Sequence, residues 1–316
     1  MSTDGPSTAP VAAIDCGTNS IRLLIARGAG DGGLVDVERR MEVVRLGFDV
    51  DRTGRFDPAA IERTLAATRE YAAAISAHGA ERIRFVATSA TRDASNREEF
   101  IDGVREILGV APEVVPGDVE AELSFRGAVS TLDGLVPGQR LVVDIGGGST
   151  ELVAGVEAPE HRISLDMGSV RLTERHLRSD PPSEPEIDAA RADIDSLLDQ
   201  AEEVVPLAPT RTLVGVAGTV TTLTALAQGL EVYTPDATHG ARLDVARMRE
   251  VCLEVLAMST DERRRRPIIH PGRIDVIGAG ALIWERVLAR VQEASGISEV
   301  RSSEHDILDG IALSLL

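Results

Sequence analysis

Asp15-Cys-Gly-Thr-Asn-Ser20 and Asp144-Ile-Gly-Gly-Gly-Ser149 decide the fold, because one pattern occurs in both stretches. Each reads Asp-x-Gly-x-x-Ser and lies between two short segments rich in β-branched residues. Such a pair of segments predicts a β-hairpin whose turn carries glycine and hydroxyl groups. Two copies at the spacing of a domain predict a duplicated fold in which the two turns face each other across a cleft.

The rest of the chain follows an α/β pattern, in which short apolar segments alternate with segments of helical periodicity. Strands are predicted at residues 11–15, 21–26, 82–87, 140–145 and 211–216. A helix is predicted over residues 58–76 because Asp57 can cap it and Pro58 suits its first turn. Asp118 is expected to cap a second helix, and a third is expected over residues 186–204.

Length and composition favour a globular protein of two domains. The chain has 316 residues, of which 43% are hydrophobic. No apolar run reaches the roughly 18 residues that span a bilayer. The cysteines, Cys16 and Cys252, lie far apart and form neither a disulfide framework nor a zinc motif. A reducing cytoplasm is therefore the expected location.

The charge composition restricts the ligands. A net charge of −18 makes general attraction to nucleic acid or to an anionic membrane unfavourable, so neither is expected as a partner. All 33 basic residues are arginine. The absence of lysine excludes a lysine-dependent phosphate-binding P-loop and a Schiff base. An anionic ligand must instead be held by arginine, backbone N–H groups or a metal ion.

The run Gly146-Gly147-Gly148 costs backbone entropy on folding, and a function would explain it. Successive glycines let the backbone approach a ligand and direct N–H groups toward an anion. With Ser149 and Thr150, the run is therefore a candidate phosphate-binding turn. A plain tight hairpin is the alternative.

Carboxylates follow or precede both turns. Asp15 and Asp144 end apolar strands, and Glu151 follows the second turn. Mg²⁺ is commonly bound by a few carboxylates together with water and phosphate oxygens, so these three residues are candidate ligands of Mg²⁺ or Mn²⁺. The alternative is that the aspartates bond only the amides of their own turns.

Other candidate residues are ambiguous when taken alone. Arg92 is suited to clamping a phosphoryl group, but a loop arginine is more often a solvated surface residue. For Glu120, a first-turn position favours a helix-dipole role. The turn Gly215-Val-Ala-Gly-Thr219 fits either an anion site or close packing, and the run 263–266 fits either a polyanion guide or a solvated helix end. Helical spacing around Gly278 and Gly280 argues against a dinucleotide fingerprint.

The motifs together resemble the exopolyphosphatase / guanosine pentaphosphate phosphohydrolase family. Those that carry the resemblance are Ala13-Ile-Asp-Cys-Gly-Thr-Asn-Ser-Ile-Arg22, Val86-Ala-Thr-Ser-Ala-Thr-Arg92, Val143-Asp-Ile-Gly-Gly-Gly-Ser-Thr-Glu151, Gly168-Ser-Val-Arg-Leu-Thr-Glu174, Gly215-Val-Ala-Gly-Thr219, Arg273-Ile-Asp-Val-Ile277 and Ser303-Glu304. The resemblance implies two ribonuclease-H-like domains of the actin-like ATPase and sugar kinase superfold. It places them at residues 1–128 and 129–304, with a last helix at 305–316 packed on the first, and suggests a homodimer.

The resemblance also implies a reaction: release of the terminal phosphate from inorganic polyphosphate or from guanosine pentaphosphate, the alarmone of the stringent response. Glu120 would be the catalytic base and Arg92 would steady the phosphoryl oxygens. The phosphate-binding residues would be Gly17, Thr18, Asn19, Ser20, Gly146, Gly147, Gly148, Ser149 and Thr150.

One departure from the family pattern leaves a second function open. Where the family has Ser-Gly-x-Glu-Glu-Ala, this chain has Pro116-Gly-Asp-Val-Glu-Ala121. Glu120 is kept, but Val119 replaces the preceding glutamate. The alternative function is a weakly active protein that binds polyphosphate or the alarmone and acts as a regulator.

Overall fold

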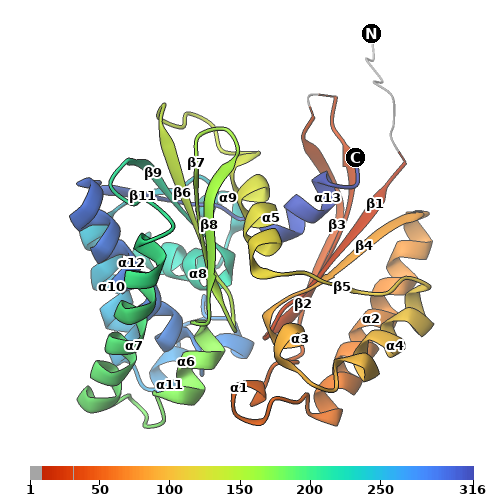
Figure 1. The fold of residues 1–316 in the computed structure, drawn as a ribbon, viewed down its shortest axis with the longest axis horizontal. Coiled ribbons are helices and arrows are strands. Elements are labelled where there is room, and N and C mark those ends of the chain that lie inside the picture. Colours follow the sequence, from red (N-terminus) through yellow and green to blue (C-terminus); the bar gives the residue numbers. More distant parts are fainter. Residues whose placement is uncertain (1–8, 31) are drawn as a thin grey trace. The chain divides into compact units, whose positions relative to one another are not determined.

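The structure is a computed structural model that describes residues 9–30 and 32–316. The chain divides into two compact units (Figure 1). The first unit comprises residues up to Thr131 together with Ile307–Leu316, and the second comprises Leu132–Asp306. These limits lie within three residues of those expected from the sequence.

The first unit is built on a five-stranded sheet in the order β3-β2-β1-β4-β5. β1 is antiparallel to β2, β2 is antiparallel to β3, and β1, β4 and β5 are parallel. The strands are β1 (Val11–Cys16), β2 (Ser20–Gly28), β3 (Leu34–Val43), β4 (Arg82–Ala87) and β5 (Glu113–Val114). The helices are α1 (Val50–Thr53), α2 (Pro58–His78), α3 (Ser89–Asp93), α4 (Arg97–Leu108), α5 (Gly117–Val129) and α13 (Ile307–Leu313).

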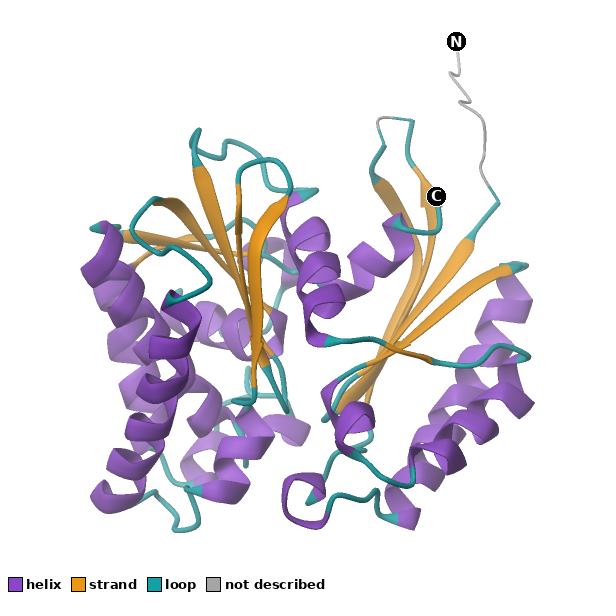
Figure 2. Ribbon diagram, in the orientation of Figure 1, coloured by secondary structure: helices purple, strands orange, loops and turns teal. Residues whose placement is uncertain are grey.

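Both faces of β1 are buried, which explains why β1 is apolar at every position except Asp15. Side chains of alternate β1 residues, such as Ile14, belong to a core shared with α2 and α4. Ala13 points to the other face, into a core shared with α5 and α13. Figure 2 shows these helices in layers on the two faces of the sheet.

The second unit is built on a six-stranded sheet in the order β10-β11-β9-β6-β7-β8. The strands are β6 (Gln139–Ile145), β7 (Thr150–Gly155), β8 (Pro159–Leu165), β9 (Thr210–Val216), β10 (Arg242–Asp244) and β11 (Glu299–Ser302). The helices are α6 (Ser169–Arg175), α7 (Glu184–Glu202), α8 (Ala217–Ala227), α9 (Pro235–Thr238), α10 (Val245–Ala257), α11 (Thr260–Arg264) and α12 (Ile277–Ser295), with a 3₁₀ turn at Pro271–Arg273.

The two sheets repeat one topology. When β6, β7, β8, β9 and β11 take the places of β1 to β5, strand order and strand direction are the same in both units. The turns match as well: the Gly17 N–H donates to the Ser20 carbonyl at 3.0 Å, and the Gly146 N–H donates to the Ser149 carbonyl at 3.0 Å. The predicted duplication of a ribonuclease-H-like α/β domain is confirmed. The additional strand β10 lies at the edge of the second sheet.

Two helix starts differ from the expected positions. Asp118 does not cap α5, because the Pro116 carbonyl already accepts the N–H groups of Val119 and Glu120, which places Asp118 inside the first turn. α7 starts at Glu184, two residues before the predicted start, because Ser183 and Glu186 form a capping box. In contrast, Asp57 caps α2 as expected.

One arginine of the run at residues 263–266 is buried and the other three are exposed. Arg263 is buried and donates hydrogen bonds to the carbonyls of Val255, Leu256 and Ile274. Within the described parts of the chain, no helix is long and apolar enough to cross a bilayer.

Candidate active site

The glycine turn of the second unit rests on the first turn of α6. The Gly146 carbonyl accepts the N–H of Ser169 at 3.0 Å. The Gly147 carbonyl accepts the N–H groups of Val170 and Arg171 at 2.8 and 3.1 Å. The Gly148 carbonyl accepts Nε of the buried Arg171 at 2.7 Å. All three carbonyls of the glycine run therefore face α6.

This orientation determines where the N–H groups of the turn point. In a trans peptide the C=O and the following N–H point in opposite directions. The N–H groups of Gly147, Gly148 and Ser149 therefore point away from α6. None of the three donates a hydrogen bond to another residue in the described ranges 9–30 and 32–316. Three successive free N–H groups have a geometry suited to an anion, and the phosphate-binding role of this turn stays a prediction.

Gly168 makes this arrangement possible. A Cβ atom at Gly168 would lie 2.3 Å from the Gly147 carbonyl oxygen, so no larger residue fits without moving the turn. Sequence reasoning did not place Gly168 or Arg171 in the site. The signal was present, since both lie in the Gly168-Ser-Val-Arg motif.

The turn of the first unit is supported differently. The Thr18 carbonyl accepts the N–H of Gly47 at 2.8 Å, and the Asn19 carbonyl accepts the N–H groups of Val44 and Arg45 at 3.1 and 2.9 Å. A Cβ at Gly47 would lie 2.4 Å from the Thr18 side chain, so a glycine is required there too. The Thr18 hydroxyl is buried and has no hydrogen-bond partner among the described residues. The hydrogen-bonding capacity of this hydroxyl is therefore unused.

Glu120 and Arg92 form the central ion pair of the first unit. Arg92 Nη1 donates to Glu120 Oε2 at 2.6 Å and to the Val115 carbonyl at 3.0 Å. Glu120 is only 8% exposed. Burial raises the pKa of Glu120 above its usual value, and the charge of Asp15 raises it further. The Arg92 guanidinium and a hydrogen bond from Thr88 oppose that shift.

The predicted metal ligands have different neighbours in the two units. Asp15 lies directly opposite Arg22 across β1 and β2, and Arg22 donates to Asp15 Oδ2 from Nε at 2.9 Å and from Nη2 at 2.6 Å. At the equivalent register position of the second unit, Asp144 lies opposite Glu151. Glu151 accepts a hydrogen bond from Ser164 at 2.6 Å. The first carboxylate therefore has an internal counterion, whereas the second faces another carboxylate.

Residues that could hold a metal are consequently concentrated at Asp144 and Glu151. Facing side chains in an antiparallel pair have Cβ atoms about 5 Å apart, and both of these carboxylates are buried. Two buried carboxylates in this arrangement fit Mg²⁺, which completes its shell with water and phosphate oxygens. A cage of three or more acidic, histidine or cysteine residues is absent from the described residues.

The turn Gly215-Val-Ala-Gly-Thr219 makes close packing contacts, and its alternative role as an anion site stays a prediction. A Cβ at Gly218 would lie 2.1 Å from the Arg273 guanidinium, and a Cβ at Gly280 would lie 2.7 Å from the Thr219 side chain. Gly280 therefore allows α12 to lie close to Thr219, whereas the Arg273 guanidinium beside Gly218 is the end of a flexible side chain. Gly278 and Gly280 lie inside α12, so the rejection of a dinucleotide fingerprint is confirmed.

Comparison with known proteins gives consistent matches over nearly the whole chain. The Ppx/GppA phosphatase family matches residues 24–315. Exopolyphosphatase 2 of Mycobacterium tuberculosis is 50% identical over 313 residues, which cover 96% of this chain and 98% of that protein.

Solved structures that resemble this chain come from the same group of proteins. The crystal structure of an exopolyphosphatase-like protein has a TM-score of 0.94 and 50% identity, covering 97% of each chain. The Aquifex aeolicus PPX-GPPA enzyme has a TM-score of 0.81 and 32% identity, covering 98% of this chain and 100% of that one.

Proposed function

The chain belongs to the Ppx/GppA phosphatase family, and we propose that it is a phosphohydrolase that releases the terminal phosphate of inorganic polyphosphate. Exopolyphosphatase 2 of Mycobacterium tuberculosis, at 50% identity over nearly the full length of both chains, supports this substrate. The glycine turn supports it chemically, because free N–H groups and arginine are suited to phosphate oxygens.

The observation that carries the proposal is the state of Glu120. A general base works best when its pKa approaches the operating pH. Burial raises the pKa of Glu120 toward that range, while the hydrogen bond from Arg92 favours the ionised carboxylate. A carboxylate that only complements a helix dipole has no need of burial. Glu120 would therefore accept the proton of the attacking water.

The remaining residues have supporting roles in this proposal. In the second unit, the N–H groups of Gly147, Gly148 and Ser149 bind phosphate oxygens. In the first unit, the hydroxyl of Thr18 is a candidate donor. Arg92 orients Glu120 through their hydrogen bond. Phosphoryl transfer depends mainly on positioning and on electrostatic stabilisation, so several modest contributions are expected.

Asp144 and Glu151 would hold a divalent cation, Mg²⁺ or Mn²⁺. When bound, such an ion neutralises charge on the phosphate chain. Asp15 has a smaller role in metal binding than the sequence predicts, because Arg22 already occupies one of its oxygens with two hydrogen bonds.

Val119 does not favour the regulatory alternative. Its side chain is partly buried and packs against the apolar core between the sheet and α13. The replacement of the family's glutamate therefore places an apolar side chain against an apolar surface and leaves the Glu120–Arg92 pair intact. The cytoplasmic location and the homodimer are further proposals, which rest on the family resemblance and the composition.

The test is phosphate release in the presence of Mg²⁺ from long-chain polyphosphate, short-chain polyphosphate and guanosine pentaphosphate in parallel. We expect the highest kcat/KM with polyphosphate. A higher kcat/KM with guanosine pentaphosphate would make the alarmone the principal substrate. Tight binding of all three without phosphate release would contradict the enzymatic function.

A further inference from the structure

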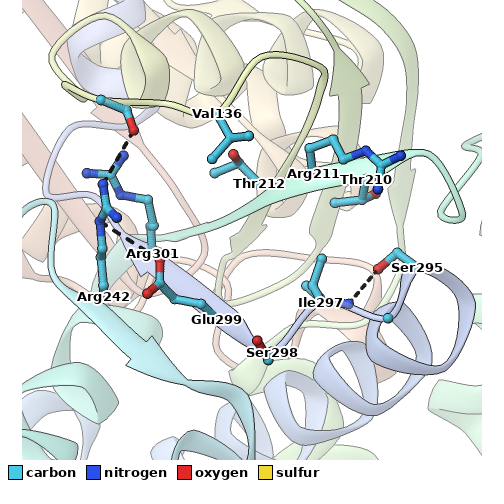
Figure 3. Close-up of a pocket in the computed structure, with 12 residues that line it drawn as sticks. Val136, Thr210, Arg211, Thr212, Arg242, Ser295, Ile297, Ser298, Glu299 and Arg301 are labelled. Carbon is cyan, nitrogen blue, oxygen red and sulfur yellow. Dashed lines mark hydrogen bonds and ion pairs between the residues drawn. The ribbon is translucent and has the colours of Figure 1, made fainter.

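A pocket lies in the second unit at the end of the sheet opposite to the glycine turn. Its volume is about 380 Å³, and it is lined by the first residues of β9 and β10, by β11 and by the end of α12 (Figure 3). The seven residues of β9 lead from this pocket to the turn Gly215-Val-Ala-Gly-Thr219, a length of roughly 20 Å. The pocket is therefore separate from the candidate active site.

The pocket has a positive lining in a strongly acidic chain. Three guanidinium groups, those of Arg211, Arg242 and Arg301, line it with a single carboxylate, Glu299. Figure 3 shows Arg242 and Arg301 on one side of the pocket and Arg211 on the other, with Thr212 between them. Arg211 forms no ion pair or hydrogen bond through its side chain with any residue in the described ranges. Its charge is therefore available to a ligand.

Two of the arginines are held against each other. Arg242 and Arg301 are register partners across β10 and β11. Like charges directly opposite each other in an antiparallel pair are destabilising. Burial lowers the pKa of Arg301 below its usual value, and the charge of Arg242 lowers it further. An anion placed between the two guanidinium groups would remove this repulsion.

Buried polar atoms at the pocket have no partner. The Oγ1 atom of Thr212 and the Nε atom of Arg301 are buried without a hydrogen bond to any described residue. Thr212 is 7% exposed and Arg301 is 9% exposed. Leaving a buried polar group unsatisfied costs about 1–3 kcal/mol, so unpartnered donors around one cavity indicate a missing acceptor.

Few groups near the pocket disfavour the binding of an anion. Glu299 lies 3.8 Å from Arg242 and offsets one of the three positive charges, and the charges of Glu299 and Asp133 both favour the charged form of Arg301. The carbonyls of Asp133 and Gly134 accept hydrogen bonds from Arg301 and Arg242 and fix both guanidinium groups. The C-terminal end of α12 also borders the pocket and disfavours an anion there, but this effect is limited to about one turn.

We propose that this pocket is a second anion site, which binds a small phosphate-bearing ligand of at least two negative charges. The planar fork of arginine matches phosphate oxygens, and a volume above 300 Å³ is typical of small-molecule sites. Arg242 and Arg301 bind one end of the ligand, Thr212 donates its hydroxyl, and Arg211 binds the other end. The assignment does not depend on the reaction proposed for the glycine turn.

The test is calorimetric titration of the intact protein with methylenediphosphonate, a diphosphate analogue that resists hydrolysis. We expect the wild-type protein to show a binding event that Arg211→Gln weakens about tenfold, because a hydrogen bond to a charged group is worth about 1.5–3 kcal/mol. Thr212→Val should weaken the same event. It should also raise Tm without ligand, because the variant removes an unsatisfied hydroxyl, and this readout shows that the variant folds.

Arg178→Gln is the matched control. It removes one exposed positive charge from the same unit, at a residue outside the pocket, and should leave the binding event unchanged. Binding that is the same in wild type, Arg211→Gln and Thr212→Val would overturn the proposal, as would an absence of binding to the wild type. Tighter binding of citrate than of methylenediphosphonate would overturn the assignment of phosphate as the ligand chemistry.

Discussion

Arg92 donates a hydrogen bond of 2.6 Å to Oε2 of the buried Glu120, so that the proposed base has a fixed position and a partly compensated charge. Replacement of Glu120 by glutamine keeps the shape and one acceptor but removes the proton-accepting group. General bases of this kind contribute about 10²–10⁴ in rate. We expect Glu120→Gln to lower kcat for polyphosphate by that factor, with an unchanged circular dichroism spectrum.

Glu122 supplies the matched control for this variant. It lies two residues further along α5 and pairs with Arg126 at the surface. Glu122→Gln should retain a kcat close to that of the wild type. Equal kcat values for Glu120→Gln and the wild type would show that Glu120 is not the base.

The pH profile should report the environment of Glu120. A base acts when it is ionised, so activity falls as the pH decreases through its pKa. Because burial raises that pKa, the acidic limb of kcat/KM should lie above the ordinary range of a glutamate. Removing the Arg92 charge raises the pKa further, so Arg92→Gln should move the limb to higher pH. A limb that moves to lower pH in this variant would contradict the assignment.

Gly168→Ala should damage the glycine turn without touching the ligand directly. The added methyl group would lie 2.3 Å from the Gly147 carbonyl oxygen, which forces the turn to move. Overpacking of this kind costs about 1–3 kcal/mol of unfolding free energy. We expect a lower Tm and a raised KM for polyphosphate. Gly30→Ala is the control, because a Cβ there meets no atom within 4 Å.

Substitutions in the two hairpins should differ in their effect on the apparent affinity for Mg²⁺. Glu151→Gln removes a carboxylate that faces Asp144, and we expect the apparent affinity for Mg²⁺ to fall about tenfold or more. Asp15→Asn should change it less, because Asp15 is paired with Arg22. Titration of activity with Mg²⁺ measures both variants. A larger loss of affinity in Asp15→Asn than in Glu151→Gln would place the metal in the first unit.

The sequence predicted the duplicated fold because its signal was local. The pattern around Asp15 and Asp144 contains both the buried strand and the tight turn, and both depend on neighbouring residues. β3 was missed for the opposite reason: it lies at the sheet edge with many exposed residues, and its charged sequence lacks an apolar pattern. The start of α7 depended on the reciprocal hydrogen bonds of Ser183 and Glu186, which the adjacent prolines obscured.

The residues of the candidate site could be proposed from the sequence, but the contacts between them could not. Glu120, judged by its helix position alone, suggests a dipole role, because nothing in the sequence shows that Arg92 and Thr88 converge on it. The support of the glycine turn by Gly168 joins segments about 20 residues apart through backbone atoms, which side-chain patterns do not reveal. The arginine pocket depends on the register of β10 and β11, which is likewise invisible before folding.

Arg22 and Glu151 occupy equivalent register positions, so the two hairpins should respond differently to a chelator. In the first hairpin the counterion of the aspartate is covalently part of the chain and cannot be extracted. In the second, the residue opposite Asp144 is Glu151, and the cation proposed to lie between them would come from solution. EDTA should therefore raise the rate of amide hydrogen exchange in the second hairpin and leave the rate in the first hairpin unchanged.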